Sequence, residues 1–198
     1  MTDRQRLWDE RYAAQDRVWS AGPNREVERI VAPWPPGRAL DLGAGEGRHA
    51  IWLAQAGWTV TAVDFSSVGV ARGAEEARRQ GLEAAIEWVV EDVTLWEPPP
   101  GTFYDLVLVA YLHLPEEVLS RATRWLAPEG AIVVVGHALR NLTEGVGGPQ
   151  DPAILTTVEQ LHAAARDLDL ERCEEVVRPT DAGDAIDLVL VARRPAGA

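Results

Sequence analysis

Three alternate glycines directly after a short apolar run are the strongest chemical signal in the sequence. The run Ala39–Leu42 leads into Gly43, Gly45 and Gly47, and an amphipathic segment over Arg48–Ala56 follows. Glycine allows a sharp turn and a close approach of the backbone to a ligand, because it has no Cβ atom. A helix that begins after such a turn presents free N–H groups and a partial positive charge. The segment therefore predicts a strand, loop and helix that bind a small cofactor.

The glycine spacing distinguishes two classes of adenosine cofactor. The dinucleotide fingerprint G-x-G-x-x-G would place its third glycine at position 48, but Arg48 stands there and the third glycine is Gly47. Asp41, two residues before the first glycine, favours a cationic ligand and would repel a pyrophosphate. It lies where the methionine ammonium of S-adenosylmethionine would sit. We therefore expect S-adenosylmethionine, and an NAD(P)-dependent oxidoreductase is the alternative.

Two further acidic residues follow predicted strands. Asp64 comes 21 residues after Gly43, and a carboxylate there can accept hydrogen bonds from both hydroxyls of an adenosine ribose. The alternative, a helix N-cap, belongs better to Ser66 or Ser67. Asp92 is expected at the adenine amino group, and its alternative is a surface turn.

Two histidines are candidates for the chemistry itself. His113 follows the apolar run Leu106–Ala110, and His137 ends the run Ala131–Gly136. Both would lie at the carboxyl ends of strands, where open α/β sheets bind ligands. Either could act as a general base for an acceptor that arrives protonated, and together they could also hold a metal, although we predict no metal site. Alternatively each caps a strand or bonds a loop carbonyl.

Short apolar runs alternate with amphipathic helical patterns along the chain, which predicts an α/β, Rossmann-like, doubly wound and mostly parallel sheet. The seven expected strands are Ala39–Leu42, Thr59–Val63, Ala85–Val90, Leu106–Ala110, Ala131–Gly136, Leu170–Arg178 and Ile186–Ala192. Helices are expected over Arg48–Ala56, Ser67–Gln80 and Pro115–Leu126, and from Thr156 or Thr157 to about Asp167. The connection Pro179–Ala185 is too short for a crossover helix, so one strand near the C-terminal edge should be antiparallel. The long connection Leu139–Pro152 either shapes a ligand site or is disordered.

Size and composition bound the partners. A chain of 198 residues fits one domain, here an arm over residues 1–36 and a core over residues 37–198. Its net charge of −12 argues against nucleic acid as a partner. It has one cysteine, no apolar run of about 18 residues and no signal-peptide pattern. We therefore expect a cytoplasmic protein without a membrane segment, either a monomer or a homodimer.

From about Arg38 to its end, the chain resembles the class I S-adenosylmethionine-dependent methyltransferases. The segment Asp41–Gly47 is similar to their first motif, Asp64 to their ribose-binding acid and Glu91-Asp92-Val93 to their adenine-contacting step. The segment Tyr104–Ala110 is similar to their fourth strand, whose end lies beside the methionine moiety. The cofactor-binding residues expected on these grounds are Asp41, Gly43, Ala44, Gly45, Gly47, Arg48, Asp64, Phe65, Asp92, Val93 and Ala110.

The segments Trp8–Tyr12 and Val18–Asn24 resemble the N-terminal arm of the tellurite-resistance and thiopurine methyltransferase-like group. In that group the arm folds over the cofactor and shapes the substrate pocket. The resemblance implies that Trp19 and Asn24 line the pocket, and the alternatives are core packing for Trp19 and a turn for Asn24. His113 and His137 are further candidates for the pocket because of their positions after strands.

The function expected from these features is in-line methyl transfer to a small molecule, with S-adenosylhomocysteine as the product. No Asn-Pro-Pro-Tyr or Asp-Pro-Pro-Tyr follows the fourth strand, which disfavours methylation of base or glutamine amino groups. The absence of a cysteine cluster disfavours arsenite. A small, neutral or cationic, partly apolar acceptor remains. A protein that binds S-adenosylmethionine without catalysis is a further alternative.

Overall fold

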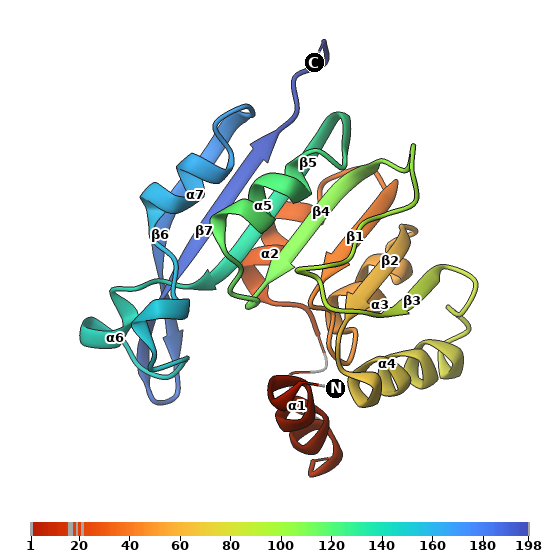
Figure 1. The fold of residues 1–198 in the computed structure, drawn as a ribbon, viewed down its shortest axis with the longest axis horizontal. Helices are drawn as coiled ribbons and strands as arrows, with labels where there is room; N and C mark the ends of the chain where they lie inside the picture. Colours follow the sequence, from red (N-terminus) through yellow and green to blue (C-terminus); the bar gives the residue numbers. More distant parts are fainter. Residues whose placement is uncertain (1, 16–17, 19, 21, 198) are drawn as a thin grey trace. The chain divides into compact units, whose positions relative to one another are not determined.

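The computed structural model describes residues 2–15, 18, 20 and 22–197, which are divided between two compact units, Met1–Thr102 and Phe103–Ala198 (Figure 1). The prediction of a single domain, with an arm over residues 1–36 and a core over residues 37–198, stays a prediction. Among the described residues, no helix has both the length and the apolar character that a membrane crossing requires.

The first unit contains three parallel strands in the order β3-β2-β1. Its elements are α1 (Asp3–Ala13), α2 (Arg25–Val31), β1 (Arg38–Leu42), α3 (Arg48–Gln55), β2 (Thr59–Asp64), α4 (Ser67–Arg79) and β3 (Ile86–Val90). Helix α3 packs against β1 and β2, and α4 packs against β2 and β3. Strands β1 and β2 are buried along nearly their whole length, as strands covered on both faces are. Their carboxyl ends carry the glycine loop and Asp64.

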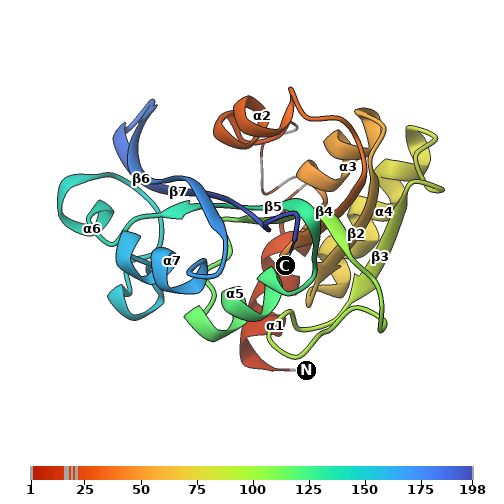
Figure 2. The ribbon, with the colours of Figure 1, turned by 90° about the horizontal axis from the view of Figure 1, so that it is seen from above.

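The second unit contains four strands in the order β4-β5-β7-β6. Its elements are β4 (Tyr104–Ala110), α5 (Glu116–Thr123), β5 (Leu126–His137), α6 (Asn141–Glu144), the 3₁₀ helix η1 (Pro152–Ile154), α7 (Val158–Ala164), β6 (Asp169–Thr180) and β7 (Gly183–Arg193). Helices α5 and α7 contact one another and lie on the same side of the strands of this unit (Figure 2). Strand β5 is parallel to β4, whereas β7 is antiparallel to both β5 and β6.

The strands confirm the predicted fold class. Seven strands form the sheet, which is mostly parallel, and β7 is the reversed strand near the C-terminal edge. Strand β6 runs to Thr180 and β7 begins at Gly183, so the connection is shorter than the predicted Pro179–Ala185, and it joins antiparallel strands as expected. The chain therefore has the α/β, Rossmann-like architecture that the alternation of apolar runs and helical patterns predicts.

Two helices end earlier than their patterns predict. Helix α5 stops at Thr123 instead of Leu126, because the Trp125 carbonyl accepts a hydrogen bond from the Tyr104 amide and Leu126 already pairs with β4. Helix α7 stops at Ala164 instead of about Asp167. Of the two predicted starts, Thr156 and Thr157, the structure has Thr157, which forms the capping box with Gln160.

Candidate cofactor site and acceptor site

The glycine loop has the backbone conformation that requires glycine. Gly43, Gly45 and Gly47 have φ angles of 75°, 56° and 77°, in the left-handed region. A Cβ atom on Gly47, the N-cap of α3, would lie 2.2 Å from the ring of Trp88 on β3. The Gly43 amide donates to the Val63 carbonyl at 2.8 Å, which fastens the loop to the end of β2. The loop is therefore a fixed turn whose backbone a ligand can approach closely.

Asp41 is buried at this turn with one carboxylate oxygen unmatched. Its side chain is 1% exposed, and Oδ2 has no hydrogen-bond partner among the residues that the structure describes. Burial raises the pKa of Asp41 to about 7, and the neighbouring charge of Arg48 opposes this rise. A buried acceptor without a donor is costly unless a ligand supplies one. The carboxylate therefore suits a cationic group such as the ammonium of S-adenosylmethionine.

Asp64 is held by the backbone on both sides of its carboxylate. Oδ2 accepts a hydrogen bond from the Gly45 amide at 2.9 Å, and Oδ1 accepts one from the Ser66 amide at 2.8 Å. Burial raises the pKa of Asp64, and these two amides oppose the rise. Each oxygen has a second lone pair, which suits the two hydroxyls of a ribose. Ser66 is the N-cap of α4, so Asp64 does not take the alternative role of helix N-cap.

The candidates for the adenine ring lie in the same unit. Val93 is buried and Phe65 is half-buried. The Oδ1 atom of Asp92 accepts hydrogen bonds from the amide and hydroxyl of Thr94 at 2.9 and 2.8 Å. Asp92 thus forms the turn that was its alternative reading, and its adenine contact stays a prediction. Ala110 ends β4 in the second unit and is half-buried.

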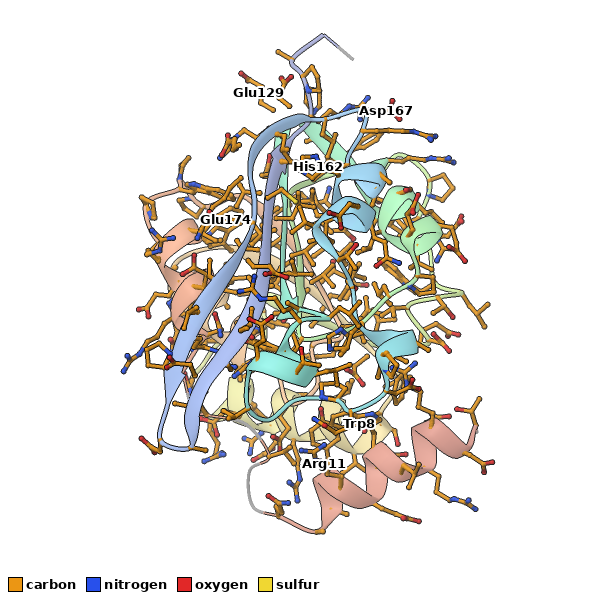
Figure 3. All side chains as sticks on the ribbon, turned by 90° about the vertical axis from the view of Figure 1, so that its left-hand side faces the viewer. Trp8, Arg11, Glu129, His162, Asp167 and Glu174 are labelled. Carbon is orange, nitrogen blue, oxygen red and sulfur yellow. The ribbon has the colours of Figure 1, made fainter. Side chains whose placement is uncertain are left out.

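Helix α1 packs on the loop that follows Asp64. Asp9 accepts hydrogen bonds from the Ser66 hydroxyl at 2.5 Å and from the Val68 amide at 3.3 Å. The Gln5 amide group donates to the Phe65 carbonyl at 2.7 Å. Arg11 stacks over the ring of Trp8 at 4.8 Å on the same helix (Figure 3). The arm therefore contacts the expected cofactor site directly.

The two pocket candidates of the arm have different outcomes. Trp19 lies outside the described residues. Asn24 is the N-cap of α2, where Oδ1 accepts from the Glu26 and Val27 amides. The backbone amide of Asn24 donates to Nε2 of His49 at 3.2 Å. Burial lowers the pKa of His49 to about 3. Asn24 thus has a structural role, and its contact with a substrate stays a prediction.

Three further residues of the first unit, Glu46, Arg72 and Trp88, make contacts between its elements that the sequence patterns did not indicate. Glu46 lies inside the glycine motif, pairs with Arg72 of α4 at 3.2 Å and accepts a hydrogen bond from the Val18 amide at 2.9 Å. The Trp88 ring fills the space beside Gly47 and Gly73.

A cavity of about 680 Å³ lies along α3 and α4, and Arg48 is the one predicted cofactor residue on its wall.

A polar cluster in the second unit surrounds the two predicted histidines. The rings of His113 and His137 stack with their centres 6.2 Å apart. Nδ1 of His137 lies 3.3 Å from Oδ1 of Asp187 on β7. The Tyr111 hydroxyl and Nε of Arg178 each donate to Oδ2 of Asp187 at 2.6 Å. Within the described parts of the chain, no three metal-ligating side chains are grouped to hold a metal ion.

Asp187 is the centre of this cluster and is 2% exposed. Burial alone would raise its pKa, but the contact with His137 and the hydrogen bonds from Arg178 and Tyr111 hold the pKa below its ordinary value. Burial and the charge of Asp187 in turn raise the pKa of Tyr111, so its hydroxyl stays a donor. Sequence patterns did not indicate Tyr111, Arg178 and Asp187, because they follow or belong to three different strands whose pairing brings them together.

Comparison with known proteins finds a family that matches part of the chain. Residues 39–130 match the family described as "Methyltransferase domain". The ribosomal RNA small subunit methyltransferase C of Alcanivorax borkumensis is 41% identical over 110 residues, which are 52% of this chain and 33% of that protein. The phosphatidylethanolamine N-methyltransferase of Cereibacter sphaeroides is 33% identical over 108 residues, 53% of each chain. The chain thus spans one third to about half of these relatives.

Solved structures share the fold over most of the chain. TehB from Haemophilus influenzae superposes with a TM-score of 0.74 at 18% identity, over 88% of this chain and 63% of that one. The N-methyltransferase NodS from Bradyrhizobium japonicum, in complex with S-adenosylhomocysteine, has a TM-score of 0.73 at 19% identity, over 98% and 100% of the two chains.

Residues 39–130 thus match a methyltransferase domain, and the chain shares its fold with TehB and NodS. The matched segment and the shared fold agree with the resemblance to the class I S-adenosylmethionine-dependent methyltransferases that the sequence predicts. The cofactor that this class uses is S-adenosylmethionine. The unmatched oxygen of Asp41 and the glycine turn fit this cofactor, and both belong to the first unit.

Proposed function

We propose that this protein is a methyltransferase that transfers the methyl group of S-adenosylmethionine to a small molecule. The observation that carries the proposal is the buried carboxylate of Asp41, whose Oδ2 lacks a donor at a turn of three left-handed glycines. In this proposal Asp41 binds the ammonium group, Asp64 binds the ribose, and Phe65, Asp92 and Val93 surround the adenine. The bound cofactor supplies a methyl group on a sulfonium whose departure needs no proton. The protein's task is then to orient the acceptor and to exclude water.

Charge supports a small acceptor over a nucleic acid. The chain carries 31 acidic residues and 19 arginines and lysines, for a net charge of −12. Proteins that bind RNA or DNA neutralise phosphates with basic side chains, whereas this charge repels a polyanion at long range. One relative is named for ribosomal RNA and another for a phospholipid. The balance of charge favours an acceptor that is neutral or cationic and partly apolar.

The cofactor is tested by thermal unfolding with S-adenosylhomocysteine and NAD in parallel. A ligand at 100 times its dissociation constant adds about 2.7 kcal/mol of stability. We expect S-adenosylhomocysteine to raise the midpoint and NAD to leave it unchanged. Stabilisation by NAD alone would refute the proposed cofactor and favour the oxidoreductase.

The acceptor is tested by incubating the protein with tritiated S-adenosylmethionine and three fractions: small metabolites, total RNA and phospholipid vesicles. We expect tritium in the small-molecule fraction. Label in RNA or vesicles alone refutes the small acceptor. Cofactor binding without transfer to any fraction supports a protein that binds the cofactor without catalysis.

A further inference from the structure

The second unit contains a groove of about 720 Å³ that has no role in the proposed methyl transfer. One wall is the segment from Leu139 through α6, the other wall is the start of α7, and the floor is β6 (Figures 1 and 2). All of its lining residues belong to the second unit. Sites for small molecules have volumes of roughly 300–1,000 Å³, so the groove has the size of such a site.

Two contacts fasten the walls of the groove to its floor. The Cys173 thiol on β6 donates to the Val158 carbonyl of α7 at 3.7 Å. On the other side, Nη1 of Arg140 lies 2.9 Å from Oε2 of Glu175 on β6. The groove therefore has its shape without a ligand, and binding needs little reorganisation of the backbone.

The inner surface of the groove is mainly apolar and open to water. Leu139 is 38% exposed, and Leu142, Val158 and Cys173 are half-buried. They come from four different places in the chain but line the same space. Removing such apolar surface from water is favourable, so the groove suits the apolar part of a ligand.

The charges around the groove favour a cation. Three glutamates line it, Glu159, Glu174 and Glu175, against one arginine, Arg140. The arginine is already held by Glu175 and, at 3.4 Å, by Glu144. An anion would face the three carboxylates, and it would reach Arg140 only by displacing both partners. A cation meets carboxylates without breaking any ion pair of the arginine.

Glu159 is the carboxylate best placed to meet a ligand. Glu174 pairs with Arg172 of its own strand at 2.5 Å, whereas in the part of the chain that the structure describes no arginine is paired with Glu159. Burial raises the pKa of the Cys173 thiol to about 11, and the charge of Glu159 adds to the rise. The carboxylate of Glu159 therefore acts on the apolar floor of the groove.

We propose that this groove binds a small amphipathic cation, with the cationic head beside Glu159 and the apolar tail on Leu139, Leu142 and Val158. The inference goes beyond the proposed methyl transfer and does not depend on it. The ligand class is an amine or quaternary ammonium compound that carries an alkyl or similar apolar group.

The ligand class is tested by calorimetry with two probes of equal tail length, n-hexyltrimethylammonium and n-hexanesulfonate. Saturating S-adenosylhomocysteine is present, because the buried carboxylate of Asp41 would also attract a cation. We expect the ammonium to bind at least about tenfold tighter than the sulfonate, since their heads carry opposite charges beside the same carboxylates. The preference should shrink as salt is added, because these carboxylates are at the surface.

The position of the ligand is tested with one variant and one matched control. Glu159→Gln should weaken ammonium binding by about two- to fivefold, the effect of one exposed charge pair. Glu116→Gln should change nothing, since Glu116 is likewise an exposed glutamate in the first turn of a helix of this unit, α5, but does not line the groove. Nuclear Overhauser contacts should join the hexyl protons to the methyl groups of Leu142 and Val158.

Four results would overturn the inference. Equal affinity for the two probes would show an apolar surface without charge preference. Unchanged affinity in Glu159→Gln, or Overhauser contacts elsewhere in the protein, would place the cation at another site. A dimer in light scattering that Leu142→Glu dissociates would show that a second copy of the chain covers the groove. If S-adenosylhomocysteine does not bind, the proposed function fails, while the contacts at Leu142 and Val158 still decide this inference.

Discussion

Replacing Asp41 with asparagine should stabilise the protein at pH 8 and weaken its cofactor affinity at the same time. A carboxyl whose pKa is raised on folding gives its full stability below the unfolded pKa and loses it as the pH rises through the folded one. For Asp41 that window extends from 3.8 to about 7. At 1.36 kcal/mol per pKa unit, the ionised side chain costs the folded state about 4 kcal/mol at pH 8.

The asparagine side chain removes this charge but leaves a buried amide with no partner for its N–H groups, which costs about 1–3 kcal/mol. The net expectation is a gain of about 1–3 kcal/mol at pH 8. Between pH 8 and pH 5 the wild-type side chain becomes protonated, so the difference in unfolding free energy between variant and wild type should shrink by about 3 kcal/mol. Losing a charged hydrogen bond to the cofactor ammonium should weaken binding by about 10- to 100-fold.

Urea unfolding at pH 8 and pH 5 measures the first effect, and calorimetry with S-adenosylhomocysteine measures the second. Asp167→Asn is the control, because that aspartate is exposed and belongs to the second unit, whereas the cofactor loop belongs to the first (Figure 3). It should change neither quantity. A variant of Asp41 that is less stable at pH 8, or that binds S-adenosylhomocysteine as tightly as the wild type, would refute the reasoning.

Three other outcomes are expected. Gly47→Ala should cost at least about 2 kcal/mol more in urea unfolding than Gly81→Ala, because both have positive φ but only the Cβ at Gly47 meets the Trp88 ring; equal costs would argue against that contact. Asp64→Asn should weaken S-adenosylhomocysteine binding at least tenfold and cost about 1–3 kcal/mol, since one buried amide loses its acceptor; unchanged affinity in calorimetry would mean that the ribose lies elsewhere. His49 has a pKa lowered from 6.5 to about 3, so stability should fall as the pH drops below 6.5. In His49→Gln that slope should flatten by up to about 1.4 kcal/mol per pH unit in urea unfolding between pH 6 and 4; a slope equal to the wild type's would contradict it.

The sequence predicts those helices and strands whose ends are determined by residues close to them in the chain. The strand at Arg38–Leu42 and the helix at Arg48–Gln55 lie within one residue of their predicted ends, because an apolar run and a glycine turn bound them. The end of α5 was missed because the apolar stripe continues through Trp125 and Leu126, although Leu126 belongs to β5. Only the pairing with β4 decides which element takes that residue.

The candidate sites divide in the same way. Asp41, Asp64 and the glycines follow one another within a strand–loop–helix motif, so their spacing alone indicates a cofactor. His113 and His137 were also identified from their positions after strands. Asp187 and Arg178 were not, because Asp187 contacts His137 from one strand of a hairpin and Arg178 contacts Asp187 from the other, and the sequence does not reveal the register of that hairpin. A pattern predicts which strand ends carry polar side chains, but not which residues of other strands contact them.

The Ser66 hydroxyl has a consequence for anyone who prepares this protein. It accepts a hydrogen bond from the Gly69 amide at the start of α4 and donates one to Asp9 of α1. The Ser66 amide also donates to Asp64, so one residue connects helix α1 to the carboxylate that we propose binds the ribose. Affinity tags fused ahead of α1, or protease trimming of that helix, will therefore alter measured ligand constants even though every proposed ligand-binding residue is retained. Comparisons between preparations need identical N-termini.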